Sequence, residues 1–211
     1  FLPRASRFDQ LPDLEWSFGS IGVNDKARFL ATLYIEDVGD LIKDGVTPYF
    51  GFNRYAEKLG MSAHSFAPID QALQQPGNII ETWMLELLKK HIEEQRPDVV
   101  GLTIPFPGNL YAALKCGQYI KQNYPHLTVV AGGGYVNTEL RELAEPAVFN
   151  YLDYVTLDDG ERHLLNILEF LGGERKAGEL SRTFTRIDHE VRYVNSEQEG
   201  SFSHKDIGCP D

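Results

Sequence analysis

Small, polar and aromatic residues that could contact a ligand lie directly after three apolar segments of the sequence. The candidate cofactor-binding residues are Thr103, Pro105, Phe106, Gly132, Gly133, Gly134, Tyr135, Asn137, Asp158, Gly160 and Glu161. A glycine run lets backbone N–H groups approach a ligand closely, because no Cβ stands in the way. The same run is compatible with a tight turn. Its spacing matches neither G-x-G-x-x-G nor G-x-x-x-x-G-K-[ST], which excludes those dinucleotide and phosphate-binding motifs.

The last of these loops, residues 158–161, is acidic and has two interpretations. Asp158 with Glu161 three residues later has the spacing of a capping box, in which both side chains satisfy the first turn of a helix. Alternatively, the loop lines a ligand site. Its negative charge would repel a polyphosphate, so a large and nearly neutral cofactor fits it better than ATP or NAD.

Residues suited to catalysis do not form a recognisable set. His163 lies beside leucines on an expected helix, and we interpret it as a helix histidine rather than a ligand; His91 and His189 are also interpreted as structural. Cys116 has the spacing of a small buried residue. No paired carboxylates, Ser-His-Asp arrangement or metal-ligand spacing stands out, so the chain alone is expected to bind rather than catalyse, with no catalytic or metal-ligating residue.

The elements that must position the candidate residues alternate between strand and helix. Residues 98–103, 127–131 and 151–156 are apolar and rich in β-branched side chains, as in strands buried on both faces, and a helix is expected after each. This order predicts an α/β fold with a Rossmann-like parallel sheet of three or more strands, flanked by helices, whose turns share one edge. Residues 182–186 and 190–194 predict a C-terminal β-hairpin on the rim.

The first 96 residues are expected to be mostly helical and to pack on the sheet, after an irregular aromatic arm over residues 1–25. Apolar spacing predicts a helix from Lys26 to about Gly45, with Tyr34 and Val38 on its apolar face. Asn78 is a good cap for another helix, which has Trp83 and Leu87 on a core-facing stripe and ends before Pro97. A helix capped at Asn109 is expected after the first strand. Sheets usually have about four to six strands. One or two more strands are therefore expected before Phe1, unless an element within residues 1–96 is a strand.

Composition limits the possible partners. The chain has 211 residues and a net charge of −11, the wrong sign for following nucleic acid or an anionic membrane. No apolar run approaches the roughly 20 residues that cross a bilayer. Two cysteines do not indicate a secreted scaffold or a metal centre, so a cytoplasmic location is expected. Because the sequence begins without methionine, we interpret the chain as an excised fragment.

Taken together, the loops resemble a known family. The segment GLTIPF, then 26 residues between Pro105 and Gly132, then the glycine run, is similar to the S-x-L and GG elements of cobalamin-binding domains, with Thr103 in place of serine. The stretches PDVVGLTIPFPGNLYAALK, VVAGGGYVNTELREL and LDYVTLDDGERHLL resemble the N-terminal cobalamin-binding-type domain of a group of radical SAM proteins. The segment LYIEDVGDLIKDGVTPYFGFNRYAEKLG resembles the helical part before it.

This resemblance implies an accessory domain in front of a radical SAM barrel, with cobalamin over the carboxyl edge of the sheet. Residues 1–96 would be the helical segment, 97–195 the cobalamin-binding-type core, and 196–211 a linker toward the barrel. That domain of the same polypeptide would be the partner, within a radical SAM enzyme such as a methyltransferase. The chain lacks D-x-H-x-x-G and C-x-x-x-C-x-x-C, so no lower axial ligand is assigned. The 4Fe-4S cluster and S-adenosylmethionine would belong to sequence outside it.

Two other functions remain open from the sequence. One is a structural or interaction domain of a radical SAM protein that has lost the cofactor and docks through aromatic residues: Phe1, Trp16, Phe18, Tyr49 and Phe50. The other is a flavodoxin-like or receiver-like domain, which ranks last because Asp98 begins its strand instead of ending it.

Overall fold

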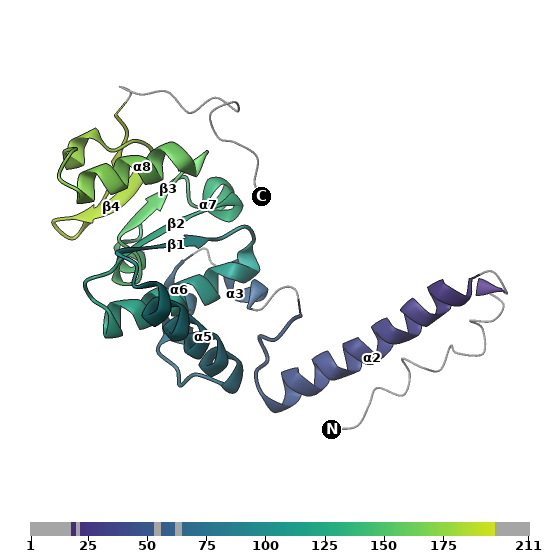
Figure 1. The fold of residues 1–211 in the computed structure, drawn as a ribbon. Coiled ribbons are helices and arrows are strands. Elements are labelled where there is room, and N and C mark those ends of the chain that lie inside the picture. The colour runs from purple at the N-terminus through teal and green to yellow at the C-terminus, as the bar shows by residue number, and fades with distance from the viewer. Residues whose placement is uncertain (1–17, 20–21, 53–55, 62–64, 197–211) are drawn as a thin grey trace. The chain divides into compact units, whose positions relative to one another are not determined.

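The computed structural model describes residues 18–19, 22–52, 56–61 and 65–196 (Figure 1). The chain divides into two compact units, Phe1–Tyr55 and Ala56–Asp211. Most of the expected aromatic arm and nearly all of the expected linker lie outside the described residues.

The first unit is built around one long helix, α2 (Val23–Gly45). Asp25 in its first turn and Lys43 in its last turn both complement the helix dipole. The helix begins three residues before the Lys26 expected from the apolar spacing, since Asn24 and Asp25 are compatible with a first turn. Tyr34 and Val38, expected on its apolar face, are both exposed.

The second unit contains one five-stranded sheet with the order β1-β2-β3-β4-β5. The strands are β1 (Val99–Thr103), β2 (Thr128–Gly132), β3 (Tyr154–Thr156), β4 (Thr183–Ile187) and β5 (Glu190–Val194). The first three are parallel, and β4 and β5 run antiparallel to their neighbours. The α/β prediction and the C-terminal hairpin are therefore confirmed, and the complete sheet is mixed. The hairpin turns at Asp188 and His189, both of which have positive φ.

Helices cover both faces of this sheet. They are α3 (Glu57–Met61), α4 (Ala67–Leu73), α5 (Ile79–Gln95), α6 (Pro107–Asn123), α7 (Gly134–Glu139) and α8 (Gly160–Leu171), with short 3₁₀ turns η3 (Pro146–Asn150) and η4 (Ala177–Glu179). Figure 1 shows α8 on one side of the sheet and α5 and α6 on the other. Helices α3, α4 and α5 all pack against α6.

Two expected helix starts have different outcomes. The Asn78 side chain accepts hydrogen bonds from the backbone N–H groups of Ile80 and Glu81, at 3.0 and 3.2 Å, so the predicted cap of α5 is confirmed. The cap expected at Asn109 is wrong, because α6 begins at Pro107 with Phe106 at the N-cap. Proline suits this first turn, where its missing N–H would have no helical partner.

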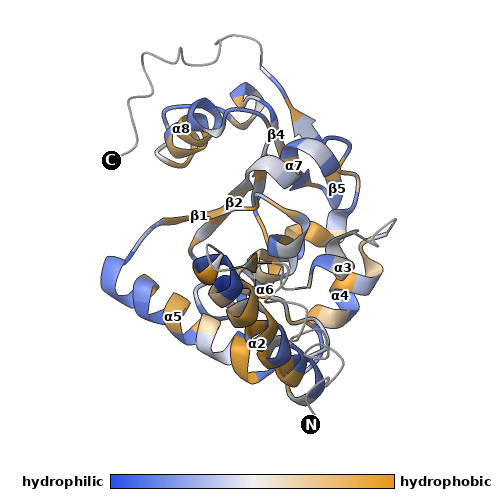
Figure 2. Ribbon diagram, turned by 90° about the vertical axis from the view of Figure 1, so that its right-hand side faces the viewer, coloured by the Kyte–Doolittle hydropathy of each residue, from blue (hydrophilic) through white to orange (hydrophobic). Residues whose placement is uncertain are grey.

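The core lies on both faces of the sheet, because neighbouring residues of a strand point to opposite sides. Val130 of β2 packs with Ile167 of α8 and with Leu180, and Val99 of β1 contacts this cluster. Figure 2 shows the hydrophobic residues that run along β1 and β2. The apolar stripe expected on α5 is only partly buried: Trp83 and Leu87 are 57% and 61% exposed.

A buried ion pair joins α5 to α6. Glu81 of α5 lies 3.8 Å from the Lys115 ammonium of α6, and Tyr111 donates to its carboxylate at 3.1 Å. Lys115 also donates to the carbonyl of Leu73 at 3.0 Å. These contacts hold α4 and α5 on α6, which is the helix that follows β1.

Across the described residues, no helix combines the length and the apolar character needed to cross a membrane.

Candidate functional site

The candidate residues lie on three strand-to-helix turns at the carboxyl edge of β1, β2 and β3. Because these strands are parallel, their turns share one edge. Thr103, the last residue of β1, pairs in register with Gly132, the last residue of β2. The edge has two halves, which the chain holds together by different interactions.

The first half joins the glycine run to the turn after β1. The Ile104 N–H donates to the Gly132 carbonyl at 2.7 Å, and the Tyr135 N–H donates to the Ile104 carbonyl at 3.0 Å. Gly133 has φ +112°, and a Cβ there would lie 2.8 Å from the Ile104 oxygen. A Cβ at Gly134 would lie 3.1 Å from the Pro105 oxygen. The close approach that these glycines permit is therefore to the protein's own neighbouring turn.

The residues of the first turn remain accessible. Thr103 and Pro105 are exposed, and the Phe106 side chain is 67% exposed. Gly101 lies on the same face of β1 as Thr103, because the two are separated by one residue. It is exposed as well, and a Cβ there would meet nothing within 4 Å. The outer part of this edge is thus an open surface of small and apolar groups.

Tyr135 is turned away from that surface. Its side chain is buried, and its hydroxyl donates to the Gly60 carbonyl in α3 at 3.2 Å. Burial, and secondarily the nearby Glu139 carboxylate, raise the pKa of this phenol. Tyr135 therefore joins α7 to α3, and the structure does not bring its ring together with Thr103 and Phe106.

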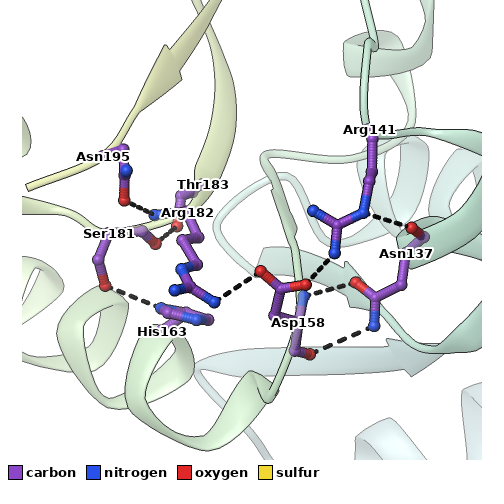
Figure 3. Close-up of polar contacts among 8 residues, drawn as sticks. All are labelled: Asn137, Arg141, Asp158, His163, Ser181, Arg182, Thr183 and Asn195. Carbon is purple, nitrogen blue, oxygen red and sulfur yellow. Dashed lines mark hydrogen bonds and ion pairs between the residues drawn. The ribbon is translucent and has the colours of Figure 1, made fainter. Parts of the chain in front are cut away.

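The second half of the edge is centred on Asp158, which has φ +59° (Figure 3). Its backbone N–H donates to the Asn137 side-chain oxygen at 2.5 Å, and the Asn137 amide donates back to its carbonyl at 3.4 Å. Its carboxylate lies 2.6 Å from an Arg182 nitrogen and also pairs with Arg141. Arg141 in addition donates to the Asn137 carbonyl at 2.8 Å. Two arginines thus neutralise Asp158.

This network changes two expectations. The capping box at Asp158 is wrong: Asp159 is the N-cap of α8, and no side chain caps that end. The repulsion expected between residues 158–161 and a polyphosphate is also reduced, because Asp158 is paired with Arg141 and Arg182. Asp159 and Glu161 are the exposed carboxylates of the loop. Sequence spacing did not reveal this network, since both arginines lie far from Asp158 along the chain.

A buried polar cluster lies beside Asp158, on the side of Arg182 (Figure 3). His163 is 3% exposed, its Nδ1 lies 2.8 Å from the Ser181 hydroxyl, and the Asn166 amide donates to the same hydroxyl at 2.9 Å. Burial, and secondarily the positive charge of Arg182, lower the pKa of His163, so the imidazole is neutral at pH 7. The Nε2 atom of His163 and the Oδ1 atom of Asn166 are buried without a hydrogen-bond partner.

This cluster is structural in the conformation described. A serine and a histidine in contact resemble a nucleophile and its base, but Ser181 is buried and out of reach of a substrate. His163 thus fits the helix-histidine interpretation. Sequence reasoning missed Ser181 and Asn166, because no motif connects them to His163.

The remaining reactive groups do not add a chemical centre. Burial raises the pKa of Cys116 to about 11, so its thiol is protonated and a weak nucleophile at neutral pH. Within the described ranges, no group of three or more histidine, cysteine, aspartate or glutamate side chains is placed to hold a metal ion.

A ligand could contact the edge only at its accessible outer residues. Thr103, Phe106 and Glu161 offer exposed polar and apolar contacts there. The glycine run does not open a slot between the strands, because Gly133 already contacts Ile104.

Comparison with known proteins adds no functional assignment to this site. No protein-family model, no curated protein and no solved structure matches the chain. What the fold and the edge define is an α/β protein with a mixed sheet and a candidate ligand surface at the carboxyl ends of its parallel strands.

Proposed function

We propose that this chain is a cobalamin-binding-type accessory domain, with a Rossmann-like core, of a cytoplasmic radical SAM enzyme. The observation that carries the proposal is the position of Thr103, Gly132 and Asp158 on three turns at one edge of parallel strands. Ligands of open α/β sheets bind at this edge. The sequence resemblance supplies the identity of the cofactor and of the enzyme.

In this proposal the accessible residues of the edge contact the corrin. Thr103 and Pro105 offer a small surface, Phe106 an aromatic one, and Gly160 and Glu161 a polar border. Gly132, Gly133, Gly134 and Asn137 hold the turns in place, and Asp158 locks the third turn through its arginines. Bound cobalamin would supply methyl transfer or rearrangement chemistry. The iron-sulfur cluster and S-adenosylmethionine would be bound by the radical SAM domain outside this chain.

A second function, an interaction domain without a cofactor, is favoured by the outer edge of β1. The Asp98 carbonyl accepts from the Thr128 N–H, and the Ile104 N–H donates to the Gly132 carbonyl. The backbone groups of the residues that alternate with these, Val99, Gly101 and Thr103, therefore point away from β2. No described strand pairs with that side. Edge strands are usually protected by charge, and β1 carries none, so this edge suits a partner.

The opposite edge of the sheet is charged, unlike the edge at β1, whereas helix α8 exposes apolar side chains. The outer strand β5 carries the ion pair Glu190–Arg192, at 2.7 Å, which discourages pairing with another chain. Helix α8, by comparison, exposes Leu164, Leu168 and Leu171 along one flank. Glu169, on another flank of the same helix, pairs with Arg175 in the segment leading to β4.

Titration with hydroxocobalamin tests the cofactor proposal. The chain is incubated with the corrin, and corrin absorbance is measured in the protein fraction after gel filtration. The blocking variant is Thr103→Trp, since Thr103 is exposed at the edge; a Gly133 variant is unsuitable because its Cβ would meet Ile104. The control is Gln122→Trp, on the exposed end of α6.

Corrin that elutes with the chain and with Gln122→Trp, and is lost from Thr103→Trp, would support the cofactor site. A folded chain that carries no corrin, in a form of the protein that includes the radical SAM domain, would overturn it and favour the interaction domain.

A further inference from the structure

A groove of about 670 Å³ lies beside the candidate site, within the second unit. Residues of α3, α4, α6, α7 and the segment from Leu140 to Val148 form its walls. Its volume is within the range of small-molecule and peptide-anchor sites. Tyr135 lines both this groove and the carboxyl edge, but none of the residues proposed to contact the corrin lines the groove, so it has no role in the proposed cofactor function.

The floor of the groove is apolar and preformed. Ile69, Leu110, Leu143 and Val148 line it, and all four side chains are at least nine-tenths buried in the fold. Buried side chains from separate elements hold a shape without a ligand, so binding would not require the floor to be ordered first. Such a floor accepts apolar side chains.

The rim of the groove is negatively charged. Glu139, Glu142 and Glu145 line it, and all three are exposed. One Glu145 oxygen accepts from the Ala147 N–H at 3.2 Å, which fixes that side chain at the start of η3. Among the described residues, no lysine or arginine lines the groove. Arg141, between these glutamates in sequence, is instead held by Asp158 and the Asn137 carbonyl.

The spacing of these charges distinguishes between cationic ligands. In the described part of the chain, no three carboxylates converge closely enough to hold a metal ion. Carboxylates spread along an apolar groove instead complement several positive charges on one elongated ligand. The overall charge of −11 would also speed the approach of such a ligand.

We propose that this groove binds a short basic amphipathic segment of a partner protein. Its apolar side chains would occupy the floor over Leu110 and Leu143. Its lysine or arginine side chains would pair with Glu139, Glu142 and Glu145. This is helix-in-groove recognition, in which apolar anchors give affinity and rim charges select the partner.

Fluorescence anisotropy with a defined probe tests this proposal on the whole chain. The probe is a fluorescein-labelled synthetic peptide with leucines at helical spacing and lysine at all remaining positions. A second peptide has the same leucines and glutamate in place of each lysine. The lysine peptide is expected to bind and the glutamate peptide is not.

Matched variants separate the groove from general charge attraction. The rim variant, Glu139→Gln with Glu142→Gln and Glu145→Gln, is expected to weaken binding about tenfold, as three partly exposed ion pairs allow. The control, Glu86→Gln with Glu94→Gln and Glu174→Gln, removes the same charge from other exposed sites and should leave affinity nearly unchanged. Ala144→Trp, at the groove wall, should reduce binding by obstructing the floor.

Several outcomes would overturn the proposal. Equal weakening by the two triple variants would mean attraction to the overall charge, and full binding by Ala144→Trp would place the peptide elsewhere. Saturable binding of hexylamine in the groove without binding of the peptide would mean a small organic cation instead. All the substituted residues are exposed, so circular dichroism is expected to show unchanged folding in each variant.

Discussion

The two halves of the carboxyl edge are built in different ways. The glycine half depends on backbone contacts, with Gly133 against Ile104 at distances that exclude a side chain. The Asp158 half depends on side chains, with one carboxylate paired to Arg141 and Arg182 near a buried histidine. The first half should therefore respond to changes of volume, and the second to salt and pH. The contrast also shows that glycine runs and acidic loops are weak guides to a ligand, because each is used here for internal contacts.

The largest expected effect tests the glycine half. Gly133→Ala should lower the free energy of unfolding by about 3 kcal/mol, because it combines an unfavourable φ with a backbone clash. The matched control is Gly101→Ala, whose Cβ would meet nothing within 4 Å. That change should be neutral or stabilising by up to about 1 kcal/mol. Urea denaturation measures both, and equal values would show that the close approach at Ile104 is not tight.

A smaller effect is expected in the buried cluster of the Asp158 half. Ser181→Ala should destabilise the fold by about 2 kcal/mol, because the buried groups of His163 and Asn166 lose their shared partner. The control is Ser196→Ala, near the end of β5, which should change stability by less than about 0.5 kcal/mol. If thermal unfolding gives the same midpoint for both variants, the cluster does not stabilise this half.

Removing the charge of Asp158, which bridges Arg141 and Arg182, should lower the free energy of unfolding by a smaller amount. Asp158→Asn keeps a residue that tolerates positive φ but loses the pairing with two half-exposed arginines, so about 1 kcal/mol is expected at low salt. The difference from the unmodified chain should shrink in 1 M NaCl, because salt screens exposed pairs. Asp159→Asn serves as the control. A loss that is independent of salt would assign Asp158 a purely steric role.

The smallest expected effect is the pH dependence from His163. Its pKa is lowered in the folded state from the 6.5 of an exposed histidine, so the unfolded chain binds the proton more readily. This contribution to stability is complete above pH 6.5 and is lost as the pH falls below it. Urea midpoints between pH 7.5 and 5.5 should therefore decrease, and His163→Gln should have a flatter profile despite its lower stability. Parallel profiles would mean that His163 does not titrate in this range.

Element types were predictable because they depend on local patterns. The β-branched segment at residues 98–103 and the Asn78 cap depend on neighbours in the chain, and both agree closely with β1 and α5. The expected cap at Asn109 failed because Pro107 is better suited to a first turn. The expected burial of Trp83 failed because periodicity identifies an apolar face of a helix but not what covers it.

The sequence by itself determined an α/β chain whose candidate residues follow parallel strands, since strand and helix patterns are short-range. Only the tertiary structure decided what those residues contact. It brought Arg182 and Arg141 to Asp158, Ile104 to Gly133 and Ser181 to His163. The physical reason is that a carboxylate, a glycine or a histidine can take many partners, and the choice among them depends on which distant segments the packed core brings within hydrogen-bond or van der Waals distance.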